Sequence, residues 1–546
     1  MVTLDINYLE LEKEIKLKLE ELEKVLFDIG MELDDIDGND LKIDITPDRP
    51  DMVSLHGLVR ALKAYTKGKL TNYKVKDSKY KLIIDKSVKE VRPYTVAAVI
   101  KNLKFDDQKI KEMIWVQEKL HDTFARGRKK AAIGIYPFDV IKTPIYYFAE
   151  DPKKVKFQPL EFPRELTGLE ILSKHPTGRD YGHLLKGHKK FPFFKDANGE
   201  ILSMPPIINS HKTGKVTEDT KEIFIECSGS DLTAIKYLLN ILVTMFADMG
   251  GDIYSMTLEY PDKKIITPDL KPEERKIKVS YVNTLLGTNF SAKKIESLLT
   301  KMMYEAKATK DEIKIKVPAF RTDIWHDVDI ADDVARAYGF NNLEPRVKPV
   351  ASIGQEDIEA EIRRDVEQVM IGLGYTGTFT FALTSKEEQY KNMELKDKPH
   401  IKLGHTSEKS LNMVRTWLIP EMIKVLVSNR NKSYPQKLFE TAEVVIPDKN
   451  TDVLSKNMLK TAIITANTSA NFTEIKQVVE NLLDSFDLKY EILEAEHESF
   501  IIGRCAQVKI DGKVAGIMGE ISPKVLSNWK LEVPVAAFEM DYSWRK

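Results

Sequence analysis

The sequence predicts a multidomain α+β protein, and three of its features support this prediction. The chain has 546 residues, so three or four domains are expected at roughly 150 residues per domain. Hydrophobic residues make up 42% of the sequence, which is enough for each domain to bury a core. Strand-like and helix-like segments are mixed without a regular strand–helix–strand rhythm, which favours α+β over a doubly wound parallel sheet.

Two polar segments divide the chain. Residues 67–79 are turn-rich, and residues 261–272 are rich in Lys, Asp and Pro, as linkers usually are. We therefore expect four domains, which span residues 1–75, 80–262, 272–348 and 351–546.

The first domain begins with a predicted amphipathic helix. Its apolar residues recur every three or four positions and form one stripe: Leu11, Ile15, Leu19, Leu22, Leu26 and Ile29. A short strand over 41–45 precedes Pro47 and Pro50, which rule out a continuing strand or helix. Asp51 is placed to cap the next helix.

The later domains show further elements. In the second, strands are expected over 81–85, 95–102, 131–136 and 223–226, and helices over 107–126 and 231–249. The third is expected to have a strand over 276–279, a helix capped by Ser291, a strand over 312–317 and a helix over 328–338. The fourth begins with a helix over 358–373 and then alternates strands and helices.

Composition restricts the class of protein. Lys and Arg (83) nearly balance Asp and Glu (84), so any contact with nucleic acid must use a local patch or a basic partner. The two cysteines, Cys227 and Cys505, have no metal-type spacing and form no disulfide framework, which fits a reducing cytoplasm. The most apolar run, 238–249, is too short and too polar to span a bilayer. We therefore predict a cytoplasmic protein with no membrane contact.

One pattern occurs twice. Residues 47–52 precede a helix that contains Arg60 and Ala61, and the similar residues 318–324 precede a helix that contains Arg336 and Ala337. An internal repeat and a chance similarity both explain this echo.

The segment 209–231 is a candidate site. It begins as a polar loop and continues into an apolar strand that carries one acid, Glu226, between Ile225 and Cys227. A carboxylate in such a strand is costly unless it has a partner. The alternatives are that Glu226 faces solvent at a sheet edge and that Asn209 and Ser210 are ordinary turn residues.

Two charged clusters are further candidates. Asp329, Asp332 and Asp333 share one helix face with i, i+3 and i+4 spacing, and hard oxygen ligands suit Mg²⁺. The alternative is a solvated helix N-terminus, with Asp327 as the cap. The basic stretch 126–130 either contacts RNA phosphates or is a solvated helix end.

Six separated blocks identify a family resemblance. They are 45–51 (ITPDRPD), 175–179 (HPTGR), 209–218 (NSHKTGKVTE), 320–324 (FRTDI), 429–432 with 438–440 (NRNK and LFE), and 503–506 with 516–520 (GRCA and GIMGE). Together and in this order they resemble the β subunits of phenylalanyl-tRNA synthetases, in the shorter archaeal and eukaryotic form. The resemblance covers nearly the whole chain. Ile501 and Ile502 depart from it, because the family usually has His-Pro there.

This resemblance implies a fold and a set of partners. It implies two small related helical domains that flank an editing domain, followed by an antiparallel-sheet domain like the class II synthetase core. That core is inactive in β, whereas the α subunit binds ATP, phenylalanine and the tRNA 3′ end. In agreement, nothing in 352–546 resembles the arginine-containing ATP segment of a class II site. The implied partners are an α subunit, in an α₂β₂ heterotetramer, and tRNA(Phe).

The resemblance also implies roles for particular residues. An editing site would hydrolyse Tyr-tRNA(Phe), with Glu226 reading the tyrosine hydroxyl and Asn209, Ser210 and Thr217 lining the site. The family's Mg²⁺ pattern matches Asp323, Asp329, Asp332 and Asp333, although the third of these is usually a glutamate.

Two other classes remain open from the sequence. One is a non-enzymatic RNA-binding adaptor derived from this family, in which 209–231 is only scaffold. The other is a free-standing Mg²⁺-dependent hydrolase centred on the acids of 323–333. An adaptor would not hydrolyse Tyr-tRNA(Phe) even with the α subunit, and a free hydrolase would need no partner.

Overall fold

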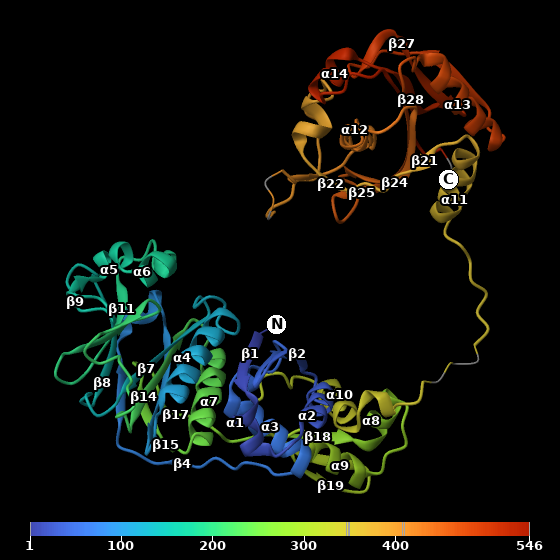
Figure 1. Cartoon of the computed structure of the whole chain (residues 1–546). Coiled ribbons are helices and arrows are strands. Elements are labelled where there is room, and N and C mark those ends of the chain that lie inside the picture. The colour runs from blue at the N-terminus through green and yellow to red at the C-terminus, as the bar shows by residue number, and fades with distance from the viewer. Residues whose placement is uncertain (1, 346, 348–349, 407, 409, 545–546) are drawn as a thin grey trace. The chain divides into compact units, whose positions relative to one another are not determined.

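The chain folds into two compact units, with the boundary between residues 347 and 348 (Figure 1). The structure, a computed structural model, describes residues 2–345, 347, 350–406, 408 and 410–544. Both units mix helices with sheets, as the α+β prediction requires. No helix within these residues has the length and apolarity needed to cross a membrane.

The first unit begins with a small module of three strands and three α-helices. Alternate residues of the first strand, Val2, Leu4 and Ile6, are buried against the helices. The sheet order is β1-β3-β2, with antiparallel pairing. The elements are β1 (Val2–Asn7), α1 (Tyr8–Ile15), α2 (Leu19–Asp28), β2 (Glu32–Asp37), β3 (Asp40–Ile45), the 3₁₀ helix η1 (Pro50–Met52) and α3 (Leu55–Lys67).

A second small module, at the end of the first unit, repeats this order of strands and α-helices. Its sheet order is β18-β20-β19, again antiparallel. The elements are β18 (Glu273–Lys278), α8 (Val279–Leu286), α9 (Ala292–Lys301), β19 (Glu305–Ala308), β20 (Glu312–Val317), α10 (Asp327–Tyr338) and the 3₁₀ helix η4 (Phe340–Asn342). Ser291 caps α9 as predicted.

The echoed sequence lies at the same place in both modules, between the third strand and the third helix. Arg49 forms a two-bond ion pair with Asp51 (2.9 and 2.9 Å), and Arg321 forms the same pair with Asp323 (2.8 and 2.7 Å). The modules also contact each other, because the Arg60 guanidinium lies 4.1 Å from the centroid of the Phe320 ring. The similarity between the two sequences therefore reflects a repeated structural feature, an arginine–aspartate ion pair between the third strand and the third helix.

Two expectations about these modules need correction. The resemblance implied helical modules, but each also contains a three-stranded sheet, in which the strands near 41–45, 276–279 and 312–317 were expected and β1, β2 and β19 were not. Asp51 does not cap α3. Ser54 does so by accepting a hydrogen bond from the Gly57 amide (2.9 Å), while both oxygens of Asp51 bind Arg49.

The centre of the first unit is built from two larger sheets. One has seven strands in the order β13-β12-β11-β8-β5-β16-β17, and the other has five in the order β4-β15-β6-β14-β7. The strands are β4 (Val75–Lys76), β5 (Lys81–Ile84), β6 (Tyr94–Lys101), β7 (Ala131–Pro137), β8 (Ile145–Glu150), β11 (Phe191–Lys195), β12 (Ile201–Met204), β13 (Ile208–Asn209), β14 (Ile223–Gly229), β15 (Asp252–Tyr254), β16 (Met256–Glu259) and β17 (Lys264–Thr267).

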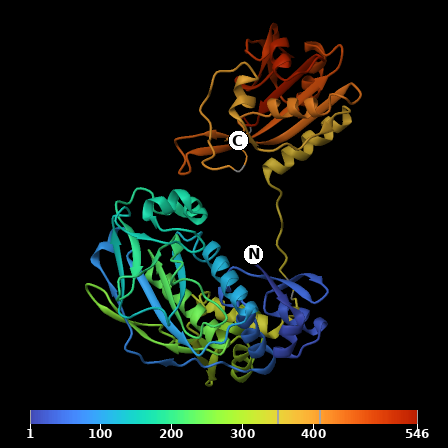
Figure 2. The same ribbon diagram turned by 60° about the vertical axis from the view of Figure 1, so that its left-hand side comes forward.

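Helices cover one face of the five-stranded sheet, and a small subdomain adjoins the seven-stranded one (Figures 1 and 2). The covering helices are α4 (Asp107–Asp122) and α7 (Leu232–Asp248). Helix α4 ends at Asp122, not at Arg126 as expected, because the backbone leaves the helical conformation at Thr123 (φ −90°, ψ −84°), and Arg126 and Arg128 further along adopt positive φ values of 53° and 64°. The remaining elements are η2 (Lys86–Glu90), β9 (Lys156–Phe157), β10 (Leu166–Thr167), α5 (Gly168–Lys174), α6 (Pro176–Tyr181) and η3 (Gly182–Leu184).

The second unit is a seven-stranded sheet with helices on both faces. The strand order is β21-β24-β25-β29-β28-β27-β26, and all neighbours are antiparallel except β21 with β24. One core lies under α12 and α14, and the other lies under α11 and α13. The elements are α11 (Ile358–Gly372), β21 (Thr376–Gly377), β22 (Leu383–Thr384), the π-helix η5 (Glu387–Lys391), β23 (Met413–Val414), α12 (Ile419–Ser428), β24 (Gln436–Pro447), β25 (Ser455–Ala466), α13 (Phe472–Ser485), β26 (Tyr490–Glu494), β27 (Phe500–Ile510), β28 (Lys513–Ile521), α14 (Pro523–Asn528) and β29 (Val535–Asp541).

Candidate functional site

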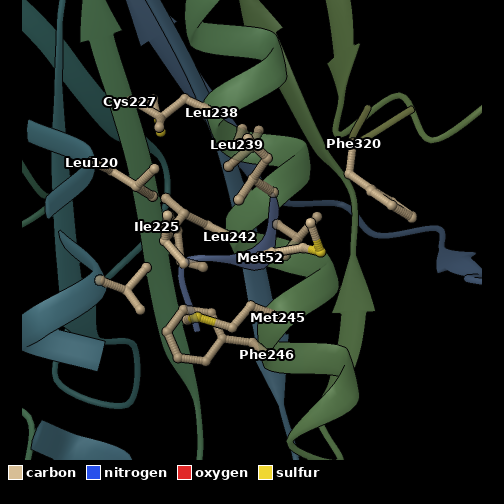
Figure 3. Packing of buried hydrophobic residues seen from close by; sticks show 14 of the residues in the cluster. Met52, Leu120, Ile225, Cys227, Leu238, Leu239, Leu242, Met245, Phe246 and Phe320 are labelled. Atoms are coloured by element: carbon tan, nitrogen blue, oxygen red, sulfur yellow. The ribbon is translucent and has the colours of Figure 1, made fainter. Parts of the chain in front are cut away.

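Strand β14 separates an apolar face from a polar one. Ile225 and Cys227 point toward α7 and pack in the hydrophobic core with Leu238, Leu239 and Leu242 (Figure 3). Because side chains alternate along a strand, Phe224, Glu226 and Ser228 lie on the opposite face. Glu226 is paired opposite Ala97 of β6 and Gly134 of β7. Glu226 therefore lies on the face from which the Tyr136 hydroxyl reaches Ser203 of the seven-stranded sheet.

The Glu226 carboxyl group is buried and only half satisfied. The residue is 2% exposed. The Tyr136 hydroxyl lies 3.2 Å from Oε1 of Glu226 and 2.8 Å from Oγ of Ser203, which belongs to β12 of the other sheet. Oε2 of Glu226 is buried without a hydrogen-bond partner among the residues that the structure describes. A buried acceptor in this state is poised for a donor from a ligand.

Burial raises the pKa of Glu226 to about 8. The nearby Arg92 guanidinium and the hydroxyl groups of Tyr136 and Ser228 oppose this rise. Arg92 is held in place by donating to Oγ (3.1 Å) and to the carbonyl oxygen (2.6 Å) of Ser228. Any further donor to Oε2 would favour the ionised form and lower the pKa again.

Glu226 lines a cavity of about 490 Å³. Gly134 makes room for its carboxyl group, because a Cβ at that position would lie 2.5 Å from Oε1 of Glu226 and 2.2 Å from the Tyr136 oxygen. Other polar residues of the wall are Gln117, Glu118, His121, Arg128, Glu161, Thr177, Ser203, Asn209 and Lys215. Apolar walls with a few convergent polar groups are typical of a small-molecule site.

The cavity contains two of the four predicted editing residues. Glu226 and Asn209 line it, and the Asn209 side-chain amide lies 3.4 Å from the Ile135 carbonyl oxygen. Ser210 is buried beside this wall, where its amide donates to the Leu202 carbonyl (2.7 Å). Thr217 is exposed in the following loop, where its backbone amide donates to Oγ1 of Thr220 (3.0 Å). The geometry therefore groups Glu226 with Asn209 and leaves Thr217 outside the cavity wall.

His121 is a site residue that the sequence did not reveal. Its Nε2 accepts a hydrogen bond from the Ile133 amide (2.8 Å), so the proton of the neutral ring lies on Nδ1, which is buried without a partner in the described part of the chain. Burial, with Arg128 and Arg92 nearby, holds its pKa well below the ordinary value. In the sequence, His121 resembles any other residue of a helix. Its role depends on β7, the neighbouring strand that supplies the Ile133 amide.

The predicted magnesium residues do not form one ligand set. Arg321 binds both oxygens of Asp323 and also contacts Asp333 (2.7 Å), which accepts a hydrogen bond from Tyr304 (2.6 Å). Asp332 pairs with Arg336 (2.7 Å).

Asp329 instead closes the start of α10. It accepts hydrogen bonds from the amides of Trp325 and His326 (2.7 Å each), and His326, not Asp327, is the cap residue. Within the residues described, no group of three or more His, Cys, Asp or Glu side chains is placed to hold a metal. The arrangement does not fit a four-carboxylate Mg²⁺ site, because arginines and amides already satisfy the acids.

The basic stretch 126–130 contributes to the cavity wall. The Arg128 guanidinium lies 4.1 Å from the centroid of the Tyr181 ring and donates to the carbonyls of Pro206 (3.2 Å) and Ile207 (2.9 Å). Arg126 and Lys129 remain exposed. One arginine of this stretch therefore has a structural role, and RNA contact by the others stays a prediction.

Comparison with known proteins agrees with this architecture. Residues 275–340 match the family model of the tRNA synthetase B5 domain, and residues 345–542 match that of the phenylalanyl tRNA synthetase beta chain CLM domain. The phenylalanine–tRNA ligase beta subunit of Pyrococcus horikoshii is 38% identical over 99% of both chains, and that of Methanocella arvoryzae is 39% identical over 99% of both. A crystal structure of an N-terminal fragment of the P. horikoshii phenylalanyl-tRNA synthetase beta-subunit covers 62% of this chain and 99% of its own, with TM-score 0.60 and 41% identity.

These matches define the class of protein as a subunit of an aminoacyl-tRNA synthetase. Within that class, the chain belongs to the family of phenylalanine–tRNA ligase β subunits.

Proposed function

We propose that this chain works with an α subunit to join phenylalanine to tRNA(Phe) with ATP, and that its own site hydrolyses Tyr-tRNA(Phe). The ligase role is supported by full-length relatives with that name, which favour it over an RNA-binding adaptor. The ATP and phenylalanine sites, together with the Mg²⁺ that accompanies ATP, are assigned to the α subunit. No step in this chain is assigned to a metal, because the acids of 323–333 do not fit one.

The editing proposal rests on Oε2 of Glu226, which has no hydrogen-bond partner among the residues that the structure describes. Tyrosine differs from phenylalanine by one hydroxyl group, and an apolar pocket rejects an added hydroxyl only by about 10². A site that hydrogen-bonds this hydroxyl discriminates more strongly, because the analogue without it leaves a buried polar group unpaired. The phenol would donate to Oε2, whereas phenylalanine would leave Oε2 unsatisfied.

Hydrolysis in this cavity would rely on a positioned water. Attack on the ester carbonyl carbon needs a water held beside it and a donor for the developing oxyanion. His121 is poorly suited as a general base, because its Nε2 is occupied by the Ile133 amide and its pKa is lowered. The Asn209 amide and the Nδ1–H of His121 are the candidate donors in the wall.

The second unit is proposed as the platform for the α subunit in an α₂β₂ complex. Arg415, which could be mistaken for a phosphate ligand, is buried and bound to Glu440 (3.0 Å) and Thr380 (2.8 Å). It therefore stabilises the sheet and is not free to bind ATP. Co-expression with the α subunit, followed by measurement of the complex mass in solution, tests the stoichiometry.

Glu226→Ala in the reconstituted complex tests the editing role. We expect unchanged Phe-tRNA(Phe) synthesis and, above pH 8 where Glu226 is ionised, at least about 10-fold slower deacylation of Tyr-tRNA(Phe), from the loss of one buried hydrogen bond to a charged group. Glu165→Ala, a change of an exposed acid in the same region, is the control. An unchanged deacylation rate in Glu226→Ala would remove Glu226 from the site.

A further inference from the structure

A single buried hydroxyl group determines which oxygen of Glu226 is free. Tyr136 lies on β7 and pairs opposite Phe224 of β14, and its side chain is fully buried. Its ring lies 5.5 Å from the Phe224 ring. This packing fixes the ring, so the hydroxyl sits between Oγ of Ser203 (2.8 Å) and Oε1 of Glu226 (3.2 Å). The hydroxyl therefore links the two sheets at the floor of the cavity.

This contact occupies one carboxylate oxygen and leaves the other open. Oε1 is engaged by Tyr136, while Oε2 has no partner within the described residues. A glutamate side chain has several rotatable bonds, and without an anchor it would turn toward other donors. The charge of Arg92 acts on Glu226, and the Ser228 hydroxyl group lies on the same face of the same strand. Turning toward either would withdraw the open acceptor.

We propose that Tyr136 is the positioning residue that sets the discrimination between tyrosyl and phenylalanyl esters in this cavity. The inference rests on the proposed editing function. Tyr136 does not touch the ester. It holds Glu226 so that the phenol meets an acceptor that is already oriented, and ordering that acceptor costs nothing further when the ligand binds.

The titration of Glu226 provides a separate readout. The hydrogen bond from Tyr136 lowers the pKa of Glu226 against the effect of burial. The ionised carboxylate is the better acceptor for a phenol, so tyrosyl selectivity is expected to rise as the pH increases through about 8. Removing the Tyr136 hydroxyl should move this rise to higher pH.

The test is Tyr136→Phe in the full complex with the α subunit. Deacylation of Tyr-tRNA(Phe) and of Phe-tRNA(Phe) is measured from pH 6.5 to 9.5. We expect the tyrosyl rate to fall roughly 10-fold, as for the loss of a hydrogen bond to a charged group, while the phenylalanyl rate does not fall. The Tyr-to-Phe selectivity therefore drops, and its pH midpoint moves upward. Aminoacylation with phenylalanine should be unchanged.

Tyr304→Phe is a matched control. Tyr304 is also fully buried and also donates to a buried carboxylate, Asp333, at 2.6 Å, but it lies in the second small module. The Tyr304→Phe change should lower the stability by a similar amount. It should leave the Tyr-to-Phe selectivity of deacylation and the pH midpoint of that selectivity unchanged.

The outcomes separate the two claims. If wild-type complex deacylates Tyr-tRNA(Phe) and Glu226→Ala does not, but Tyr136→Phe keeps the wild-type selectivity and midpoint, the inference is overturned and the proposed function stands. A Tyr136→Phe complex that slows equally on both esters, with an unchanged midpoint, also overturns it, since that result indicates general damage. If the wild-type complex leaves Tyr-tRNA(Phe) intact, the proposed function fails and the inference fails with it.

Discussion

The protein buries carboxylates in two regions, and these carboxylates differ in their hydrogen-bond and ion-pair partners. In the second small module, Asp323 and Asp333 share Arg321, and Tyr304 adds a further donor to Asp333. At the cavity, Glu226 has one hydroxyl partner and one oxygen with none in the described chain. The pKa values follow this difference. Burial raises the pKa of Glu226 to about 8, whereas Arg321 holds the pKa of Asp323 below its usual range despite burial.

The comparison shows that a conspicuous acid cluster need not be a binding site. Five acids between 323 and 333 attract attention in the sequence, yet each of the four proposed metal ligands already has a donor. Glu226, the single acid in the apolar strand β14, keeps one oxygen without a hydrogen-bond partner within the described part of the chain. A buried group that the fold leaves unsatisfied marks the place where a ligand can contribute.

The largest expected effect is on stability, from Arg321→Ala. This change leaves two buried carboxylates without their cation, and breaking a buried ion pair in this way typically costs about 3–5 kcal/mol. Denaturant unfolding of the chain measures it. Arg336→Ala, which breaks the partly exposed pair with Asp332, is the control and should cost no more than about 1 kcal/mol. Equal costs for both variants would show that Arg321 does not compensate the buried acids.

The next effect is the pH dependence caused by Glu226. Its folded pKa of about 8 lies above the unfolded value of about 4.3. Between these values the native state holds a proton that the unfolded chain releases, so the stability contributed by Glu226 falls as the pH rises toward 8. The melting temperature of Glu226→Gln, relative to wild type, should therefore increase from pH 5 to pH 8 and then level off. A difference that stays constant with pH would contradict the raised pKa.

The smallest expected effect is that of Mg²⁺ on this chain. Because protein donors already satisfy the acids of the second small module, millimolar Mg²⁺ or its removal by EDTA should move the melting temperature of the isolated chain by less than about 0.5 °C, below the roughly 1–2 °C that about 1 kcal/mol of binding would produce in a unit of this size. Differential scanning calorimetry measures this shift. A larger rise that Asp329→Asn abolishes would restore the magnesium site.

Local sequence patterns predicted the elements better than their contacts. Helix 231–249 and strand 223–226 were recognised from periodicity, and the structure has α7 and β14 there. The contacts of the residues between the third strand and the third helix of the small modules differ from the prediction. Asp51 resembled a cap, because Asp is a common cap residue, but Arg49, two residues away, pairs with it instead. Local propensity could not decide whether Asp51 binds a backbone amide at the helix start or the Arg49 guanidinium.

The candidate site was predictable only in part for the same reason. Glu226 is noticeable in the sequence because an acid in an apolar strand is unusual, whereas the role of Asn209, like those of Ser210 and Thr217, is implied only by the family resemblance. Tyr136, Ser203 and His121 carry no such signal, since tyrosine, serine and histidine are ordinary residues of strands and helices. Their role arises from neighbours that are far away in the sequence.

The sequence by itself determined the family, the α+β elements and the presence of a costly acid in β14, because these depend on the order and periodicity of residues along the chain. The tertiary structure decided which acids are compensated and which oxygen is left open. Hydrogen bonds and desolvation act between groups that meet only after folding. The Tyr136 hydroxyl of β7 links Oγ of Ser203 on β12 to Oε1 of Glu226 on β14, and no local sequence pattern predicts that contact.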